Sequence, residues 1–286
     1  MNAQFWLIQI FNGISYGALL FLVGSGLSLI FGVMRIVNLS HGSYFLLGAY
    51  VALSVIWTTG SWLLAIPVAA LAVALIGLVM ERVFLRPLGF DPLRQVLLTV
   101  GFAFLFQQAS LDIWGGNNME IEAPAALSHS IVVGHLYLPL YRIFMIAMAL
   151  VIGIATWVAM EKTRMGAAVR ATVDDAQMAR GVGIDTNRIS MFIFALGAAL
   201  AALGGVIGGT FLGVYPGLDF EILPLAFAVV IIGGMGSLGG AAIGAMLVGL
   251  ADNFGKALFP ELAYFTLYAP MVLILAVKPT GLFGRE

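Results

Sequence analysis

Long apolar runs decide what this chain can fold into. The first of them, Phe5–Val33, contains no charged residue. As a helix it would measure about 43 Å, whereas the hydrocarbon core of a bilayer is about 30 Å thick. The run must therefore tilt strongly or break, and Gly24-Ser25-Gly26 is the weak point that we expect.

Further apolar runs follow along the chain, and most are long enough to cross or half-cross a membrane. They are Ser43–Trp57, Trp62–Met80, Gln95–Ile113, Ile143–Met160, Ile189–Tyr215, Leu223–Leu250 and Tyr264–Val277. A glycine-rich stretch, 233–240, interrupts one of them, and two short helices are expected to meet there. The sequence thus predicts about nine membrane-crossing or half-crossing segments.

The scarcity of charge excludes a soluble fold. Only 9% of the residues are charged and 62% are hydrophobic, whereas soluble domains carry about 25% charged residues. We therefore predict an all-α, polytopic membrane helix bundle of about 8–10 spanning or half-spanning helices, forming one domain over residues 1–286. The net charge of −1 argues against nucleic acid as a partner, and the absence of cysteine excludes disulfides and thiolate metal sites.

Basic residues predict the orientation in the membrane, because Lys and Arg concentrate in short cytoplasmic loops. The segment 81–94 has three of them, the segment 161–188 has five, and the tail from Lys278 has two. The turn at 216–222 has none. This pattern predicts an N-terminus outside and a C-terminus in the cytoplasm, with 114–142 as a periplasmic excursion.

The excursion is expected to contain a small β-hairpin. The apolar stretches Ile131–Val133 and Leu136–Leu140 flank Gly134-His135, which suits a turn. No metal-ligand spacing joins His129 to His135, so no metal site is predicted and both histidines are interpreted as solvated or locally hydrogen-bonded.

The segment 161–188 is the longest charged stretch between two apolar runs. One interpretation is a docking loop for another protein. The other is a plain cytoplasmic loop whose charges only set the topology. Both are compatible with the residues alone.

A short helix is predicted inside this loop. Thr172-Val-Asp-Asp175 has the form of a capping box, and Gly181 suits the left-handed residue after a helix. Between them we expect a helix over Val173–Arg180, whose small alanine side could lie in a groove of a partner. Asp185 and Thr186 are expected to cap the next membrane helix, starting near Arg188.

Four motifs then resemble the permease family of branched-chain amino acid ABC importers, and most closely its H-type subunit. They are Asn38-Leu-Ser-His-Gly42, the stretch 166–205 from Gly166 through Gly-Ala-Ala-Leu-Ala-Ala-Leu-Gly-Gly205, Gly233-Gly-Met-Gly-Ser-Leu-Gly-Gly240, and Lys278-Pro-Thr-Gly-Leu-Phe-Gly284. The similarity covers nearly the whole chain, and the motifs agree in order and spacing.

The resemblance implies a permease subunit of an ATP-driven importer in a bacterial inner membrane, working by alternating access. It implies a second related permease chain or a second copy, two cytoplasmic ATPase subunits and a periplasmic solute-binding protein. In the family the loop resembling 161–188 docks onto the ATPase. The residues that would form this coupling contact are Asp174, Asp175, Ala176, Ala179, Arg180, Gly181 and Gly183.

No nucleotide site is expected in this chain, because a P-loop needs Gly-x-x-x-x-Gly-Lys-Ser/Thr and none of the three lysines, Lys162, Lys256 and Lys278, fits it. ATP-Mg would be used by the partner ATPases, with no cofactor bound here and no catalysis by this chain. Branched-chain or related hydrophobic amino acids are the expected substrates. Family relatives for urea, amides or small aromatic carboxylates keep those substrates as alternatives.

Two polar interruptions are candidates for the translocation path, since a weak internal repeat of this kind points to a path between two halves. The candidates are Asn38, Ser40, His41 and Gly42 in the first interruption, and Gly234, Gly236 and Ser237 in the second. The alternatives are an interfacial turn for the first and close helix packing for the second. The second also matches Gly-x-Gly-x-x-Gly, but without the strand–helix unit and acidic residue of a dinucleotide site.

Two amides inside a predicted span, Gln107 and Gln108, are further path candidates, because buried amides in a membrane need a partner or water. They could instead tie two helices together. Asp112 and Arg142 flank the excursion and are candidates for an ion pair.

A transporter or channel working alone is the competing hypothesis. It would need an ionisable residue deep in a span. The charged residues fall at or near expected boundaries, for example in the polar turns expected at Pro216–Glu221 and Asp252–Glu261. A membrane-embedded enzyme is a third option, which no nucleophile, metal cluster or carboxylate pair supports.

Overall fold

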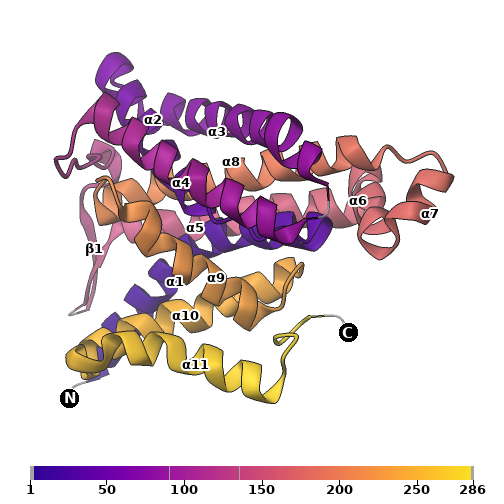
Figure 1. The fold of residues 1–286 in the computed structure, drawn as a ribbon. Helices are drawn as coiled ribbons and strands as arrows, with labels where there is room; N and C mark the ends of the chain where they lie inside the picture. Colours follow the sequence, from indigo (N-terminus) through magenta and orange to yellow (C-terminus); the bar gives the residue numbers. More distant parts are fainter. Residues whose placement is uncertain (1–2, 90, 135, 285–286) are drawn as a thin grey trace.

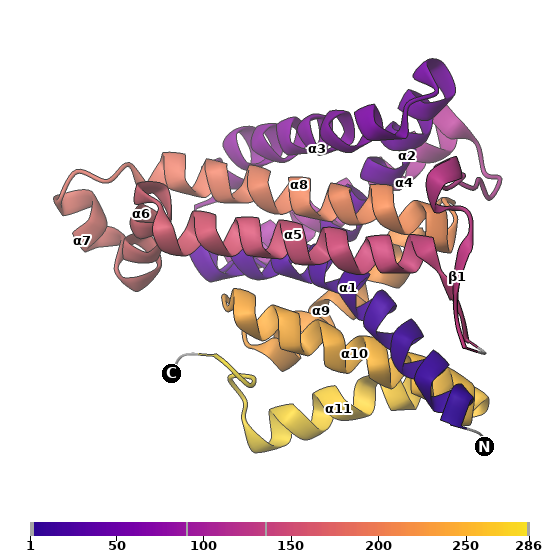
Figure 2. The same cartoon turned by 180° about the vertical axis from the view of Figure 1, so that it is seen from behind.

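The computed structural model describes residues 3–89, 91–134 and 136–284 and shows a bundle of long helices with one small hairpin (Figures 1 and 2). Within these described residues, seven helices are long and apolar enough to cross a membrane. The predicted all-α membrane bundle is confirmed.

The first half of the chain contains five long helices. They are α1 (Ala3–Met34), α2 (His41–Thr59), α3 (Trp62–Val79), α4 (Pro92–Trp114) and α5 (Leu140–Lys162). A π-helical turn η1 (Met80–Leu85) and a 3-10 turn η2 (Arg86–Leu88) extend α3. Between α4 and α5 lie η3 (Ala125–Leu127) and the antiparallel strands β1 (Ser130–Val133) and β2 (Leu136–Pro139), which form the predicted hairpin.

The second half begins with two short helices and continues with four longer ones. They are α6 (Arg164–Asp174), α7 (Ala176–Gly181), α8 (Thr186–Leu212), α9 (Leu218–Gly233), α10 (Leu238–Leu258) and α11 (Ala263–Val277), with η4 (Pro260–Leu262) before α11. Helices α9 and α10 meet at the glycine-rich stretch, as predicted, although α10 is a long helix.

The bundle has two distinct ends. We call them the α7 end, where α6 and α7 project, and the hairpin end, where β1 and β2 lie (Figure 1). The described N-terminus lies at the hairpin end and the described C-terminus toward the α7 end (Figures 1 and 2). The sequence predicts about nine crossing or half-crossing segments, and these correspond to the long helices α1–α5 and α8–α11.

Helix α1 lies at the centre and packs against α5, α8, α9 and α10. It continues through Gly24-Ser25-Gly26, so the predicted break is wrong. These glycines bring neighbouring helices close instead. A Cβ on Gly24 would lie 2.5 Å from a methyl of Val229, and one on Gly26 would overlap the Gly197 carbonyl.

The segment 35–40 runs back along α1 before α2 begins. The His41 Nε2 atom lies 3.0 Å from the Val23 carbonyl oxygen. Val23 stands about 16 Å before the Met34 end of the helix. The reversal starts at Arg35, which adopts a left-handed φ of 54°.

The N-terminal ends of α2 and α9 meet inside the bundle. Ser43 Oγ donates to Asp219 Oδ2 at 2.8 Å, and Gly42 lies so close to the Asp219 carbonyl that a Cβ would overlap it. Asp219 occupies the first turn of α9, where a helix stabilises a carboxylate. The polar turn expected at Pro216–Glu221 is therefore mostly helix, and the one expected at Asp252–Glu261 is helical up to Leu258.

Helices α2 and α8 cross with backbone in contact with backbone. Gly205 of α8 faces the Phe45 carbonyl and the Ala49 N–H of α2. Gly48 of α2 faces Ala202 in the same way. Small residues at such crossings allow the dispersion contacts that hold membrane helices together.

We predict that Gly205→Ala lowers the melting temperature of the detergent-solubilised protein, since the added methyl overlaps the Phe45 carbonyl. Overpacking of this kind costs about 1–3 kcal/mol. Gly101→Ala on α4 is the matched control, because its added Cβ meets no atom within 4 Å. It should leave the melting temperature unchanged or slightly higher. Equal melting temperatures for both variants would contradict the close crossing of α2 and α8.

Candidate functional site

Helices α6 and α7 form a small unit outside the bundle, tied to the end of α5 (Figure 1). Thr163 caps α6 by accepting from the Gly166 N–H at 3.1 Å. Arg170 donates to the Met160 carbonyl and lies 3.5 Å from a Glu161 carboxylate oxygen. We call residues 164–183 the α6–α7 unit.

The break between the two helices differs from the prediction. Thr172 lies inside α6 and donates to the Ala168 carbonyl at 2.8 Å, so it caps nothing. Asp175 caps α7 by accepting from the N–H groups of Gln177 and Met178 at 2.8 and 2.9 Å. The predicted single helix over Val173–Arg180 is wrong, because the Asp175 carboxylate serves the backbone better than the Thr172 hydroxyl.

The left-handed residue after α7 is Gly183, with φ 89°, rather than Gly181. The predicted alanine contact is also wrong for Ala179, which is only 3% exposed and packs inside the unit. Ala176 is half-buried. The exposed members of the predicted set are Asp174, Asp175, Arg180, Gly181 and Gly183.

Two apolar side chains at the tip of the unit complete its exposed surface. Met178 is 66% exposed and Val182 is 72% exposed. Large apolar side chains at the tip of a projecting unit are typical of a surface that meets another protein. The prediction missed Val182, because it ended the helix before that residue.

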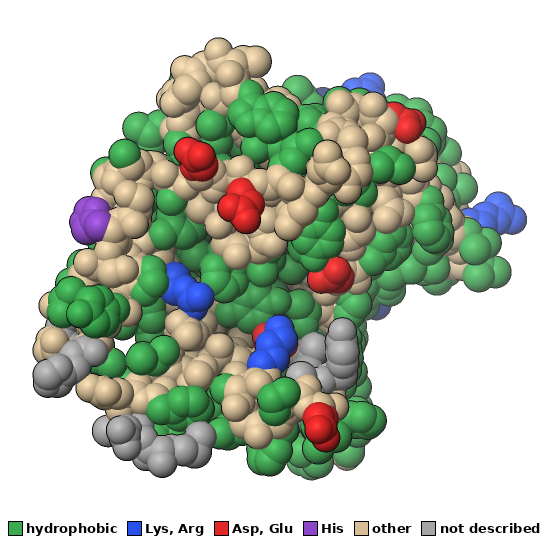
Figure 3. All heavy atoms as spheres, turned by 90° about the vertical axis from the view of Figure 1, so that its left-hand side faces the viewer, with side chains coloured by type: hydrophobic (Ala, Val, Ile, Leu, Met, Phe, Trp, Pro, Cys, Tyr) green, Lys and Arg blue, Asp and Glu red, His purple; other side chains and the backbone are tan. Residues whose placement is uncertain are grey.

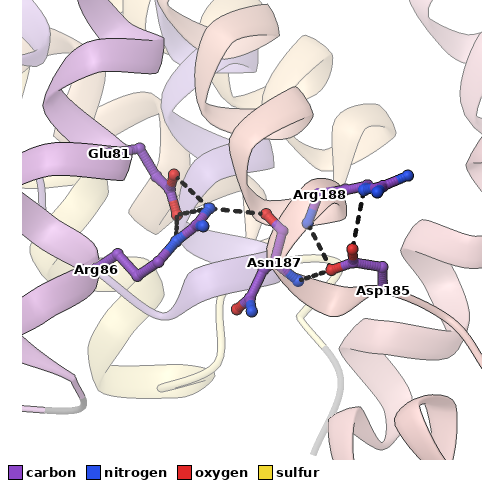
Figure 4. A network of polar contacts seen from close by, with 5 residues as sticks. All are labelled: Glu81, Arg86, Asp185, Asn187 and Arg188. Carbon is purple, nitrogen blue, oxygen red and sulfur yellow. Dashed lines mark hydrogen bonds and ion pairs between the residues drawn. The ribbon is translucent and has the colours of Figure 1, made fainter.

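The loop after α7 is held against α3 and α8 by a network of polar contacts (Figure 4). Asp185 caps α8 through the N–H groups of Asn187 and Arg188, as predicted, and pairs with the Arg188 side chain at 2.9 Å. Arg86 donates to the Asn187 carbonyl at 3.2 Å and pairs with the buried Glu81 at 2.9 Å. Asn187, in the first turn of α8, thus contacts both the Asp185 cap and Arg86 at the extension of α3.

The first set of path candidates forms a buried polar cluster. Ser40 Oγ donates to Asn38 Oδ1 at 2.7 Å, and the Leu39 N–H donates to Thr99 Oγ1 of α4 at 3.2 Å. Asn38, Ser40 and His41 are completely shielded from solvent in this chain. The interpretation of this segment as an interfacial turn is therefore wrong, and these side chains face the interior of the helix bundle.

Not every buried polar atom of this cluster is hydrogen-bonded. Among the described residues, Asn38 Nδ2 and His41 Nδ1 are buried with no hydrogen-bond partner. A polar or ionisable side chain buried in a membrane protein is a candidate functional group, so this cluster stays a candidate for the translocation path.

The two glutamines, Gln107 and Gln108, lie in different environments. Gln107 is half-buried, and its Nε2 would lie 3.7 Å from a Cβ on Gly217, beside the start of α9. Gln108 is exposed and donates to Asp112 at 2.9 Å. Arg142 donates to Asn12, so the structure does not form the candidate pair between Asp112 and Arg142.

The second set of path candidates lies in the turn between α9 and α10. Ser237 caps α10 at the Gly240 N–H, 3.0 Å away. The carbonyls of Ile232 and Gly233 accept from the N–H groups of Leu282 and Phe283 in the C-terminal tail, at 2.9 and 3.0 Å. The backbone groups freed by the turn are thus covered by the tail, which supports the close-packing interpretation.

Both sets lie along α1. Ser28 of α1 donates to the Ser237 carbonyl at 3.4 Å, and His41 lies beside Gly26 and 3.0 Å from the Val23 carbonyl oxygen. Of the candidates elsewhere, only Gln107 is near the α2–α9 junction.

Three buried carboxylates lie within helices where the sequence suggested boundary positions. They are Glu81, Asp219 and Asp252, which are 2%, 2% and 6% exposed. Each has a partner: Arg86, Ser43 and Lys256. For Asp219, the feature of the sequence that could have indicated a position within a helix was the long apolar run that follows it.

His129 is exposed, and His135 lies outside the described residues. Among the described residues no three His, Asp or Glu side chains gather as a metal site would require.

Comparison with known proteins gives the same assignment along the whole chain. Residues 9–275 match the model of the family described as branched-chain amino acid transport system / permease component. The chain is 32% identical to the high-affinity branched-chain amino acid transport system permease protein LivH of Escherichia coli strain K12, with 100% of this chain and 98% of LivH aligned.

Two further relatives agree. BraD of Pseudomonas aeruginosa, a permease protein of the same description, is 30% identical over 98% of this chain and 96% of its own length. LivM of Escherichia coli strain K12, also described as such a permease, is 27% identical over 91% of this chain and 67% of its own length. No solved structure matches. A membrane bundle aligned from end to end with LivH, and only in part with LivM, belongs to the branched-chain amino acid transport permease family and is closest in type to its H subunit.

Proposed function

We propose that this chain is a permease subunit of an ATP-driven importer for branched-chain or related hydrophobic amino acids. The end-to-end similarity to LivH carries the transport function. The projecting α6–α7 unit, with its apolar tip and exposed charges, supports a docking surface for an ATPase. ATP-Mg would be bound and hydrolysed by that partner.

The α7 end would face the cytoplasm of a bacterium and the hairpin end the periplasm. The two basic segments, 81–94 and 161–188, lie at the α7 end together with the described end of the chain (Figure 1). Lys and Arg in short loops favour the cytoplasmic side of the inner membrane. This gives an outside N-terminus and a cytoplasmic C-terminus.

The coupling mechanism follows from the connections of the α6–α7 unit. Closure of two ATPase subunits on ATP would push Asp174, Asp175, Arg180 and the tip residues. The displacement would pass through the Asp185–Asn187 loop to Arg86 and α3, and through α6 to α5. Opposite rocking of these helices would open the bundle first to one side of the membrane and then to the other.

The remaining partners follow from the family. A second, related permease chain, as LivH and LivM form a related pair of permease proteins, or a second copy would complete the path. A periplasmic solute-binding protein would dock at the hairpin end, on 114–142 and 216–222.

The deciding experiment is uptake by the complex reconstituted into proteoliposomes. ATP-driven accumulation of leucine, isoleucine and valine is expected. Uptake of urea, acetamide or benzoate in their place would favour the alternative substrates. Uptake by this chain without ATPase partners would favour a transporter working alone and reject the proposal.

Met178→Asp is predicted to weaken binding of the ATPase subunit, because it puts a charge on the apolar tip of α7. Since Met178 is exposed, the fold should be unaffected. Co-purification of the ATPase with this chain measures the effect, and a loss of about tenfold or more in affinity corresponds to about 1.4 kcal/mol.

Tyr137→Asp is the matched control, because Tyr137 is 70% exposed on β2 at the opposite end. It should leave ATPase binding intact. If both variants retain the ATPase equally, α7 is not the docking helix.

Arg86→Gln is predicted to separate ATP hydrolysis from transport. It removes the guanidinium that bridges the Asn187 carbonyl and the buried Glu81 carboxylate, while the docking tip stays in place. ATPase activity of the reconstituted complex should persist, and amino acid uptake per ATP should fall severalfold.

Arg94→Gln serves as its control, since Arg94 pairs with Asp91 on the surface and contributes little. A combined Glu81→Gln and Arg86→Gln variant avoids leaving a buried carboxylate unpaired. Normal uptake per ATP in both Arg86 variants would refute the coupling route through α3.

A further inference from the structure

The hairpin end of the bundle is hollowed (Figure 3). Lys or Arg side chains project at the hollow, carboxylates lie around it, and hydrophobic side chains line its depth (Figure 3). Only 9% of the residues of the chain are charged, so a gathering of both signs of charge over an apolar floor needs a reason.

A continuous series of ring and cation contacts joins four helices at this end. The Arg142 guanidinium of α5 lies 4.7 Å above the Phe211 ring of α8. The Phe211 ring lies 6.3 Å from that of Tyr16 in α1. The Lys256 ammonium of α10 lies 5.7 Å from the same Tyr16 ring. We call Arg142, Phe211, Tyr16 and Lys256, with Glu221, the aromatic hollow.

The two cations differ in how they are neutralised. Lys256 pairs with Asp252 at 2.7 Å. Arg142 is half-buried and, among the described residues, its one recorded hydrogen-bond partner is the neutral amide of Asn12. A partly desolvated guanidinium without a carboxylate is suited to receive one from a ligand, in the bidentate geometry that arginine favours.

The hollow also holds a carboxylate, Glu221, that forms no ion pair with a described residue. Glu221 is exposed, shares a hydrogen bond with the Tyr215 hydroxyl, and lies near enough to act electrostatically on Tyr16. Burial, and then the hydrogen bond to Glu221, raise the pKa of Tyr215 to about 12. The hydroxyl of Tyr215 therefore stays protonated and is the donor in its hydrogen bond to Glu221.

The aromatic rings favour a ligand that places an apolar group between these charges. Phe211 and Tyr16 offer apolar faces beside the guanidinium and the carboxylate. A ligand with one negative group, one positive group and an apolar side chain would match all three features. An α-amino acid with an aliphatic side chain is such a molecule.

We propose that the aromatic hollow is a recognition site for zwitterionic amino acids at the mouth of the permease. Arg142 receives the α-carboxylate, Glu221 receives the α-ammonium, and Tyr16 and Phe211 contact the side chain. This inference rests on the proposed function and adds to it that the permease itself binds solutes selectively by both of their charges.

Direct binding to the purified full chain in lipid nanodiscs, without a solute-binding protein, tests the site. The probes are L-leucine, leucinamide, which lacks the carboxylate, and 4-methylpentanoate, which lacks the ammonium. The wild-type chain should bind leucine at least about tenfold more tightly than either analogue, the factor that about 1.4 kcal/mol provides.

The variants remove one charge each. Arg142→Gln should abolish the preference for leucine over leucinamide, and Arg142→Lys should restore part of it. Glu221→Gln should abolish the preference for leucine over 4-methylpentanoate. Arg94→Gln and Glu122→Gln, at exposed positions outside the hollow, are the matched controls and should retain both preferences.

The outcomes separate the inference from the proposed function. Arg142 also braces α5 to α1 through Asn12, so a purely structural role would weaken all three ligands equally. Equal weakening, or unchanged preferences in Arg142→Gln and Glu221→Gln, would overturn the recognition site while ATP-driven leucine uptake by the reconstituted wild-type complex could still uphold the permease. Absence of that uptake would remove the proposed function itself.

Discussion

The need to give every backbone polar group a partner governs this fold, because a bilayer offers no water to replace one. Two interruptions of helices inside the bundle show how neighbouring elements meet this need. The Leu39 N–H donates to Thr99 Oγ1, and Val214 exchanges both backbone hydrogen bonds with Met119.

Small residues make this covering possible. Glycines of α1, α2, α8 and α10 bring backbones so close that a methyl group would not fit at many of them. The interior can then hold a few polar side chains, such as Ser43 and Asp219, in fixed places. A tightly packed interior with paired polar groups has discrete alternative packings rather than continuous ones, as the proposed alternating access would require.

Much of the architecture could be predicted from the sequence, since long apolar runs have one solution in a bilayer. The number of crossings, the hairpin and the Asp185 cap followed from local patterns. The course of the segment 35–40 did not, because a polar stretch after an apolar run reads equally as a surface turn. Burial of Asp219 was hidden for the same reason: the partner, Ser43, lies far away in the chain.

The site was predictable in outline and not in detail. A charged loop between two spans indicated the α6–α7 unit, but only the structure shows that Asp175 divides it and that Ala179 is buried. The aromatic hollow could not be predicted from the sequence, since its residues come from five helices that are far apart in the chain.

The contacts of the tail on the α9–α10 turn join parts of the chain that are far apart in sequence. The N–H groups of Leu282 and Phe283 donate to the carbonyls of Ile232 and Gly233. Inside a bilayer no water would replace these donors. The turn between α9 and α10 therefore depends for its backbone pairing on a segment that follows α11, so a change in that segment would destabilise the junction of two membrane helices.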